Sequence, residues 1–434
     1  MAHFAIVAPD EAGHVLPNGN IGSELLRRGH RVTLLGQQRS ATLAEKLNLP
    51  FRELSFKDFP RASSRGLGLL FGLAGAGGII GMRDHFTWHA EALLRTLPET
   101  LRELAVDGLI VDQVAPAAGT VAEHLGLPFV TTCTATPWHE EACVPPPFTH
   151  ALYRPGLAAR WNNRRGYAFW HWYMRPIIKT INRFRRQWKL RPFSRIEDLN
   201  SPLAQLCQFC REFDFPRREL PAVFHYVGSL TAGCTALEVG FPWERLDGRR
   251  LVFASLGTVN DPGNRPVFRK ILEACAGLDV QVVLGLGRWD PSQESLREQL
   301  GPLPANAIVA DLVPQLQLLD RAALLITHGG VNTVLNAISR GIPIVALPRG
   351  ADQPGMCARI VFSGIGGRVP FGRSTAVEVR HLVERVLTHD TFRERAKDLQ
   401  QAMLVAGGVS RAAEIAEQAL TTRGPVFRVG KGDP

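Results

Sequence analysis

The sequence predicts an α/β fold with two doubly wound parallel-sheet domains. The chain has 434 residues, which is enough for two domains of ordinary size. Residues 4–36 have the pattern of strand, loop, helix and strand that opens a doubly wound domain. Residues 251–258 and 324–330 are further short apolar runs that end in a glycine turn. We expect a first domain over 1–230, a linker over 231–250, a second domain over 251–420 and a tail over 421–434.

The opening unit should contain a strand over residues 4–9, a loop over 10–17, a helix from about 20 to 28 and a strand over 31–36. Gly29 marks the end of the helix, because glycine is common just after a helix C-terminus. The loop has no GxGxxG, so it is not a dinucleotide-binding fingerprint. His14 lies in this loop at the carboxyl end of the first strand, where open α/β sheets bind ligands. A solvated loop histidine is the alternative.

A later strand of the first domain, residues 108–111, ends at Asp112. Asp112 could serve the same ligand edge, or it could cap the helix that we expect over 114–124. The remaining elements are expected as strands over 128–133, 279–284, 307–310, 324–327 and 343–348, and as helices over 375–388, 391–405 and about 409–420.

The composition indicates a globular protein rather than a membrane-spanning or secreted one. Apolar residues make up 45% of the chain and charged residues 21%, and no apolar run is long and regular enough for a convincing span. The strand-like start lacks the basic region of a signal peptide. The seven cysteines, an odd number scattered over a large chain, indicate reduced thiols and a cytoplasmic protein. Cys207 and Cys210 form one CxxC without a second pair, so we expect no metal site.

The net charge of +10 comes from one segment, residues 151–196. This segment has twelve basic residues and no acidic one, whereas the rest of the chain has 38 basic and 40 acidic residues. Trp and Tyr lie between the basic residues, and we expect a largely helical segment that is interrupted at Pro176. Peripheral contact with anionic lipid at the inner membrane face suits this composition. A solvated helix pair is the equal alternative; nucleic acid would also fit but is not expected.

The most informative motif is the strand end His328-Gly329-Gly330 and the helix that follows it. Glycines let a ligand approach the backbone closely, and the helix directs its free N–H groups and the positive end of its dipole at the turn. This geometry suits a phosphate. Asn332 and Thr333 lie in the first helical turn, where their side chains reach the same anion. A tight connection without a ligand is the alternative.

A second strand, residues 343–348, is followed by a loop and by Asp352 and Gln353 at the start of another helix. Two successive strand ends thus deliver polar side chains to one edge of the sheet, which is where such sheets bind ligands. Asn336 lies four residues after Asn332 and shares its helix face. For Asp352, an N-cap role is the alternative.

These residues resemble the signature of the family 1 glycosyltransferases, the UDP-glycosyltransferases with the GT-B fold. That signature has His-x-Gly-x-Asn-[Ser/Thr], then Glu, then Pro, then Asp-Gln; the corresponding residues here are His328, Gly330, Asn332, Thr333, Asn336, Pro343, Asp352 and Gln353. The resemblance implies two Rossmann-like domains that face a central cleft, with a nucleotide sugar such as UDP-glucose on the second domain. It implies that His328, Asn332 and Thr333 hold the diphosphate. It also implies that Asp352 and Gln353 bind the sugar hydroxyls, and it implies no cofactor beyond this co-substrate.

Two positions depart from the family pattern. Asn336 stands where the family usually has a carboxylate on the ribose hydroxyls, and a neutral amide pairs more weakly than a charged group. Leu312 stands where plant relatives have a Trp that stacks on the base. The resemblance still implies donor contacts from the backbone of Val313, from Gln315 and from the turn at Thr258, which approaches the phosphates.

The resemblance further implies that His14 is the general base on the acceptor and that Asp112 is its partner. A hydroxyl is a weak nucleophile at neutral pH, so a neutral imidazole takes its proton as it attacks. A buried carboxylate then fixes the tautomer and stabilises the imidazolium. The implied reaction is one displacement with inversion at the anomeric carbon. The helix dipole and polar side chains meet the leaving-group charge without a metal.

The chain looks most like the bacterial carotenoid glucosyltransferases, which implies a lipophilic acceptor such as a carotenoid. The residues that carry this resemblance are 214–217, 220–221, 224–228, 241–244, 352–355 and 357–360. Residues 66–82 are uncharged and rich in glycine, so they are expected to form either a mobile apolar loop at the acceptor mouth or a plain linker. Three alternatives stay open: the same chemistry on a macrolide, phenolic or sterol acceptor, a GT-B nucleotide-sugar epimerase or hydrolase, and a non-catalytic nucleotide-sugar-binding protein.

Overall fold

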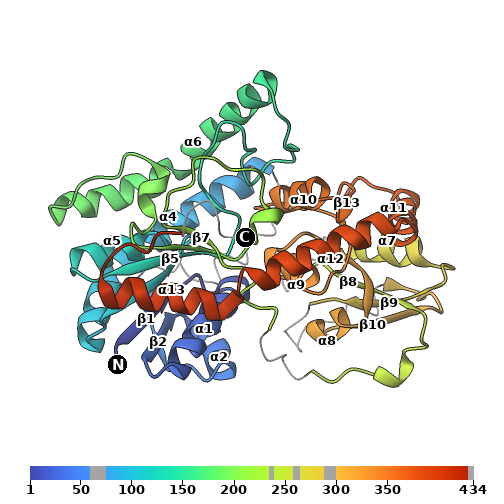
Figure 1. The fold of residues 1–434 in the computed structure, drawn as a ribbon, viewed down its shortest axis with the longest axis horizontal. Coiled ribbons are helices and arrows are strands. Elements are labelled where there is room, and N and C mark those ends of the chain that lie inside the picture. Colours follow the sequence, from blue (N-terminus) through green and yellow to red (C-terminus); the bar gives the residue numbers. More distant parts are fainter. Residues whose placement is uncertain (59–74, 234–238, 258–263, 288–299, 429–434) are drawn as a thin grey trace.

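The computed structural model describes residues 1–58, 75–233, 239–257, 264–287 and 300–428 (Figure 1). Two parallel sheets form its framework. One has seven strands in the order β3-β2-β1-β4-β5-β6-β7, and the other has six in the order β10-β9-β8-β11-β12-β13. In each sheet the strand order reverses direction beside the first strand, which is the mark of a doubly wound fold. The predicted fold class is therefore confirmed.

The strands of the first sheet are β1 (His3–Val7), β2 (Arg31–Gly36), β3 (Phe51–Glu53), β4 (Gly108–Asp112), β5 (Phe129–Cys133), β6 (Gln205–Cys207) and β7 (Phe224–Tyr226). Its helices are α1 (Ala12–Arg27), α2 (Gln38–Lys46), α4 (Gly75–Leu104), α5 (Ala117–His124) and α6 (Leu157–Gln187), with short turns η2 (Ile196–Leu199) and η3 (Arg211–Phe213). Along β1, Phe4 and Ile6 pack in one core cluster while Ala5 and Val7 pack in another. Both sheet faces are thus covered, which explains why the strand is a continuous apolar run.

The second sheet consists of β8 (Arg250–Ser255), β9 (Val280–Gly285), β10 (Ala307–Ala310), β11 (Ala322–Thr327), β12 (Ile344–Ala346) and β13 (Gly366–Arg368). The turn η4 (Trp243–Arg245) precedes it. Its helices are α7 (Arg265–Cys275), α8 (Gln315–Leu319), α9 (Val331–Ile338), α10 (Gln353–Phe362), α11 (Ala376–Thr388), α12 (Asp390–Val405) and α13 (Gly408–Thr422).

The expected loop over residues 10–17 is wrong, because α1 already begins at Ala12. The carbonyl of Glu11 accepts hydrogen bonds from the backbone N–H groups of His14 and Val15, both at 2.9 Å, and this closes the first helical turn. Pro17 lies inside the helix, where its missing N–H normally argues against helix formation. His14 therefore sits in the first turn of a helix and not in a loop.

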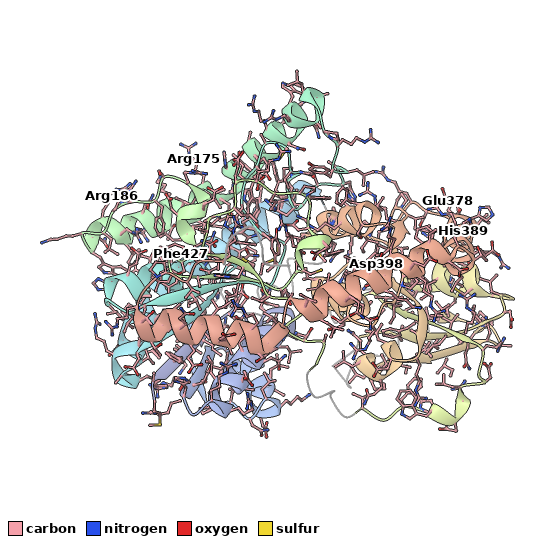
Figure 2. The ribbon with its side chains drawn as sticks, viewed as in Figure 1. Arg175, Arg186, Glu378, His389, Asp398 and Phe427 are labelled. Atoms are coloured by element: carbon pink, nitrogen blue, oxygen red, sulfur yellow. The ribbon has the colours of Figure 1, made fainter. Side chains whose placement is uncertain are left out.

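Two further expectations about helices are wrong. The expected break at Pro176 does not occur, since α6 continues through it while Met174, Ile177 and Ile181 remain buried against the first domain. Figure 2 labels Arg175 and Arg186 on the outer side of this helix. Of the expected loop 66–82, residues 75–82 form the start of α4, which packs along α6, and residues 66–74 lie outside the described residues. Packing thus overrides the low helix propensity of the glycines.

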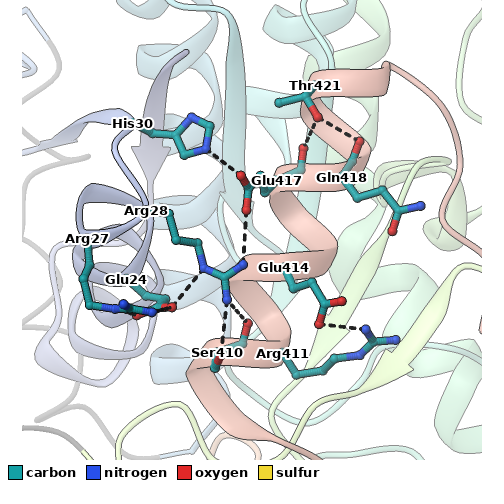
Figure 3. A network of polar contacts seen from close by, with 10 residues as sticks. All are labelled: Glu24, Arg27, Arg28, His30, Ser410, Arg411, Glu414, Glu417, Gln418 and Thr421. Atoms are coloured by element: carbon teal, nitrogen blue, oxygen red, sulfur yellow. Dashed lines mark hydrogen bonds and ion pairs between the residues drawn. The ribbon is translucent and has the colours of Figure 1, made fainter. Parts of the chain in front are cut away.

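The last helix, α13, packs on the first domain although it follows the second one along the chain. Figure 1 shows α12 beside the second sheet and α13 beside the first. In Figure 3, Glu417 of α13 accepts bonds from Arg28 at 3.1 Å and His30 at 2.9 Å. Ala412, Ala416 and Leu420 of α13 join the same core cluster as Phe4 and Ile6. The chain thus crosses back to its first domain. Within the described residues, no helix is both long and apolar enough to cross a bilayer.

Candidate active site in the interdomain cleft

A cleft of about 2530 Å³ lies between the two sheets. Its lining includes His14 from the first domain and His328 from the second, so the two histidines share one cavity. The other predicted donor residues that line it are Val313, Gln315, Gly330, Asn332, Thr333, Asn336, Asp352 and Gln353. Asp112 lies behind His14 and is fully buried. Thr258 lies outside the described residues.

His14 and Asp112 form a side-chain pair. His14 Nδ1 lies 3.1 Å from Asp112 Oδ2 and 2.8 Å from the Thr134 hydroxyl oxygen. A proton on Nδ1 satisfies either acceptor, and it leaves Nε2 as the ring nitrogen with a lone pair. This is the tautomer that a general base requires.

Three further groups hold the Asp112 carboxylate in place. Asn18 donates its side-chain amide to Oδ2 at 2.9 Å, Thr134 donates its hydroxyl to Oδ2 at 2.6 Å, and the Val114 N–H donates to Oδ1 at 2.9 Å. The Val114 contact is a local turn bond, because α5 begins only at Ala117 and has no side-chain cap. The expected helix start at residue 114 and the alternative role of Asp112 as its cap are therefore wrong. Sequence reasoning missed Asn18 and Thr134. Asn18 follows His14 by four residues, the spacing of one helix face, but the expected loop hid this signal.

The charges around His14 favour its protonated form. Burial disfavours the imidazolium, but Asp112, with further contributions from Glu11 and Asp352, outweighs burial and raises the pKa of His14 to about 9. Burial at the same place raises the pKa of the Glu11 carboxyl to about 7. The pKa of Asp352 is also raised, mainly by burial. The site therefore holds an imidazole that is strongly basic and hydrogen-bonded to a carboxylate.

On the second domain, the ring of His328 lies between two glycines. A Cβ atom at Gly257 would approach the ring to 2.9 Å, and one at Gly330 would approach it to 2.8 Å. Gly257 also has φ +90°, a conformation that side chains rarely adopt. Burial, with Arg349 nearby, lowers the pKa of His328 to about 4, although the Ser255 carbonyl opposes this shift. His328 is therefore neutral at physiological pH and can donate one N–H without adding a charge.

The turn after His328 opens onto the N-terminus of α9. Gly329 adopts φ +91°, which explains the need for glycine there. The N–H of Val334 bonds to the Gly330 carbonyl at 3.0 Å, so the N–H groups of residues 331–333 precede the first bond within the helix. These N–H groups and the positive end of the helix dipole form the kind of site that binds a phosphate.

Several of the predicted donor residues contact the first domain or the linker. Asn332 donates to the Gly13 carbonyl at 2.9 Å, and Asp352 accepts from the Thr136 N–H at 3.2 Å. Asp352 makes no side-chain cap on α10. Asn336 accepts from the hydroxyl of Thr231, in the linker, at 2.9 Å. Gln208 of the first domain also donates to Asn332, at 3.1 Å. Gln353 instead bonds within the second domain, where it accepts from the Arg349 N–H at 2.9 Å.

The segments 214–217 and 357–360 meet in a buried ion network. Asp214 lies 2.7 Å from Arg359 of α10 and 2.8 Å from Arg217, and all three side chains are at most 2% exposed. Burial opposes ionisation, but the two arginines and the Tyr226 hydroxyl hold the pKa of Asp214 well below its usual range. The network joins α10 of the second domain to the first domain.

The cysteines of the CxxC, Cys207 and Cys210, are both buried in an apolar core cluster. In the described part of the chain, no three His, Cys, Asp or Glu side chains are grouped so as to hold a metal ion. Independence of a metal stays a prediction that rests on the donor groups at α9.

The amino-acid sequence is similar to one known protein family and to two named glucosyltransferases. The family described as "Erythromycin biosynthesis protein CIII-like, C-terminal domain" matches residues 269–420. The zeaxanthin glucosyltransferase of Pantoea ananas is 36% identical over 98% of this chain and 98% of its own length. The enzyme of the same name from Pseudescherichia vulneris is 34% identical over 97% of this chain and 98% of its own.

Solved glycosyltransferase structures have the same fold. The glycosyltransferase of kitacinnamycin has a TM-score of 0.74 at 22% identity, covering 96% of this chain and 98% of that one. The calicheamicin glycosyltransferase CalG4 has a TM-score of 0.73 at 20% identity, covering 98% of this chain and all of that one. At this level of identity the likeness concerns the fold.

Proposed function

The chain belongs to the glycosyltransferase family that includes the bacterial zeaxanthin glucosyltransferases, and from this premise we propose that it transfers glucose from UDP-glucose to a hydroxyl of a carotenoid. The observation that carries the proposal is a single cleft that contains both the His14–Asp112 pair and the His328 turn before α9. The pair suits deprotonation of an acceptor, and the turn suits a departing diphosphate.

The acceptor end of the cleft supports a lipophilic substrate. It is lined by aromatic side chains from α4, α6 and the loops before α6: Phe86, Trp138, Phe148, Phe169, Trp170 and Tyr173. Apolar walls of this kind bind apolar surface, with a few polar groups to fix orientation. His14 lines the same cavity, and it would meet a hydroxyl at the end of a long apolar molecule.

In the proposed reaction, His14 Nε2 removes the acceptor proton while the acceptor oxygen attacks the anomeric carbon. The new bond forms between that oxygen and C1, and the bond between C1 and the diphosphate oxygen breaks with its electron pair on the diphosphate. Attack from the face opposite the leaving group inverts C1 and gives a β-glucoside. Asp112 stabilises the imidazolium as it forms.

The leaving diphosphate carries the developing negative charge. The N–H groups of residues 331–333, the neutral His328 and the side chains of Asn332 and Thr333 would receive it; the start of α9 and the cleft lining support this role. These donors act without a metal ion. Asp352 and Gln353 would bind the glucose hydroxyls, Asn336 the ribose, and Val313 and Gln315 the base.

The decisive test is mass spectrometry of products from a panel of sugar nucleotides and alcohols. We expect a mono- or diglucoside when UDP-glucose meets a carotenoid diol, with a β linkage by NMR. A small phenol, a macrolide and a sterol serve as competing acceptors. If another acceptor is glycosylated much faster, the carotenoid assignment fails while the reaction class stands. Consumption of donor at the same rate without any acceptor would instead support an epimerase or hydrolase.

A donor-binding measurement separates the enzyme from a binding protein. His14→Ala should bind UDP-glucose as the wild type does in calorimetry but should form no glucoside. If wild type and His14→Ala both bind donor and neither forms product with any acceptor, the protein binds nucleotide sugars without catalysis.

A further inference from the structure

The first half of α6 has an outward surface whose large apolar side chains join no core cluster of the described residues. Leu157, Trp161, Arg164, Ala168 and Trp172 follow one another at steps of three or four residues, so they lie on one helix face. Leu157 is 82% exposed, Trp161 60% and Trp172 42%. We call this surface the outer face of α6; it consists of Leu157, Trp161, Arg164, Arg165, Ala168, Trp172 and Arg175, all of which are exposed.

The start of α4 extends the outer face of α6. The Arg83 guanidinium lies 4.8 Å from the Trp172 ring centre, which places the first turns of α4 beside it. Ile79 and Ile80 of these turns are each 42% exposed. Half of the large apolar side chains that are exposed in the described residues belong to this one region, counting Phe169 with them. Exposed apolar residues that gather in this way mark an interaction surface.

The basic residues of α6 differ in their pairing between the side that faces the first domain and the outer side. Toward the first domain, the basic residues have partners: Arg183 pairs with Glu91 and Arg185 with Glu123, each at 2.9 Å. On the outer side, Arg160, Arg164 and Arg175 form no ion pair within the described residues. Because residues 151–196 contain no acidic residue, no carboxylate of the segment itself neutralises them. Figure 2 shows Arg175 on this outer side.

The same two helices also form the mouth of the cleft. Ile79, Met82 and Phe169 line it, and Ile79 and Phe169 are among the exposed apolar residues of this region. The surface and the acceptor end of the cavity are thus continuous. A molecule that moves from the outer face of α6 into the cleft therefore reaches the aromatic lining without crossing bulk water.

We propose that the outer face of α6, with the first turns of α4, docks on an anionic lipid bilayer and lets an apolar acceptor pass from the bilayer into the cleft. The lipid-to-cleft step rests on the proposed function, whereas the docking itself does not. Arginines at an anionic surface and Trp, Leu and Ile at the boundary with the acyl chains are what an interfacial helix presents. Leu157, Ile79 and Ile80 are exposed aliphatic side chains, which cannot stack on nucleic-acid bases as aromatic rings do. The surface therefore favours lipid over nucleic acid.

Binding to vesicles tests the docking directly. The full-length protein should sediment with vesicles of phosphatidylcholine mixed with phosphatidylglycerol much more than with phosphatidylcholine alone, and high salt should weaken the binding. The triple variant Arg164→Gln, Arg165→Gln, Arg175→Gln should lose about a hundredfold in partitioning, because each basic residue near an anionic surface contributes about fivefold. Arg373→Gln, Arg393→Gln, Lys397→Gln removes the same charge from exposed sites on the second domain and should change little.

A second variant separates insertion from charge. Leu157→Ser with Trp161→Ser should weaken binding to anionic vesicles but leave the fold-change with salt as in the wild type, because all the arginines remain. The proposal is overturned if binding ignores lipid charge and salt, or if the two triple variants behave alike. It is also overturned if a single-stranded oligonucleotide binds more tightly than the vesicles and only the α6 triple variant abolishes that binding.

The activity measurement keeps this proposal distinct from the proposed function. The α6 triple variant should glucosylate a water-soluble alcohol as fast as the wild type does, but should be slower on an acceptor embedded in anionic vesicles. Failure of both proteins on both acceptors would count against the proposed function and would leave the vesicle-binding result standing. Equal rates on the embedded acceptor would overturn the proposed delivery from the bilayer.

Discussion

The side-chain amide of Asn332 donates a hydrogen bond of 2.9 Å to the carbonyl oxygen of Gly13. In a regular helix that carbonyl would accept the N–H of residue 17, but residue 17 is a proline and has none. The Gly13 carbonyl, to which Pro17 cannot donate, thus accepts its bond from the first turn of α9. This contact joins the residue before His14 to the proposed diphosphate site, and it aligns the two halves of the cleft.

We expect Asn332→Asp to weaken donor binding more than tenfold. The change keeps the shape of the side chain, but it removes the N–H donor and places a negative charge beside the diphosphate. Calorimetry with UDP-glucose measures the effect. Asn162→Asp, an exposed amide on α6, is the matched control and should bind donor normally. Unchanged affinity in Asn332→Asp would place the diphosphate elsewhere.

The reaction rate should rise with pH. His14 acts as a base only when neutral, and Asp112 raises its pKa to about 9 against the opposing effect of burial, so kcat/KM should increase up to that region. In Asp112→Asn the rise should move to lower pH by more than one unit, since the charge that raises the pKa is gone. The plateau should fall at least tenfold, because the tautomer is no longer fixed. Measurement of pH–rate profiles checks both effects.

The control for this profile is His171→Gln, which removes an exposed histidine that pairs with Glu140 at 2.7 Å. It should leave the profile unchanged.

The same raised pKa affects stability: the His14–Asp112 pair stabilises the fold fully below the unfolded pKa of about 6.5, and this contribution is lost as pH rises through the folded value. A rate that is flat from pH 6 to 9 would exclude His14 as the base.

Thr134 is predicted to be a positioning residue for the His14–Asp112 pair. Thr134→Val removes the hydroxyl that bonds both partners but keeps the volume, so we expect kcat to fall about tenfold with little change in KM. The pH–rate profile should shift as well, which loss of stability alone would not cause. Thr134→Ser should restore most of the rate. Thr96→Val, which removes a hydroxyl bonded within α4, should change neither kcat nor the pH–rate profile.

Arg359→Met should destabilise the protein by about 3–5 kcal/mol in urea unfolding, because it leaves a buried carboxylate with one partner fewer. The unfolding transition should also broaden or divide, since the lost bond joins the two domains. Arg411→Met breaks an exposed pair with Glu414 and should change stability by less than about 0.5 kcal/mol. Equal effects of the two substitutions would contradict a special role for the buried network.

Local sequence patterns predicted much of this architecture. The strands ending at Asp112 and Thr327 are short apolar runs, and both lie in the sheets as expected. The start of α1 was not predictable in this way, because Pro17 normally argues against a helix and only a contact from the other domain compensates its missing bond. Likewise, packing of Ile177 and Ile181 carries α6 past Pro176.

Long-range partners explain what sequence reasoning missed at the site. Asn18 and Asp112 are 94 residues apart, and Asp214 and Arg359 are 145 apart, so no local pattern brings either pair together. The resemblance supplied the pairing of His14 with Asp112, but it did not supply the amide and hydroxyl that hold the carboxylate.

The position of α13 has a consequence for synthesis of the protein. Ala412, Ala416 and Leu420 cover apolar residues of strands that the ribosome makes first, among them Phe4 and Ile110. Until α13 leaves the exit tunnel, the part of this sheet face over β4 and β5 lacks its cover, although α1 already packs over β1 and β2. Exposed apolar surface of this kind promotes aggregation. The first domain therefore completes its core only after α13 has been synthesised.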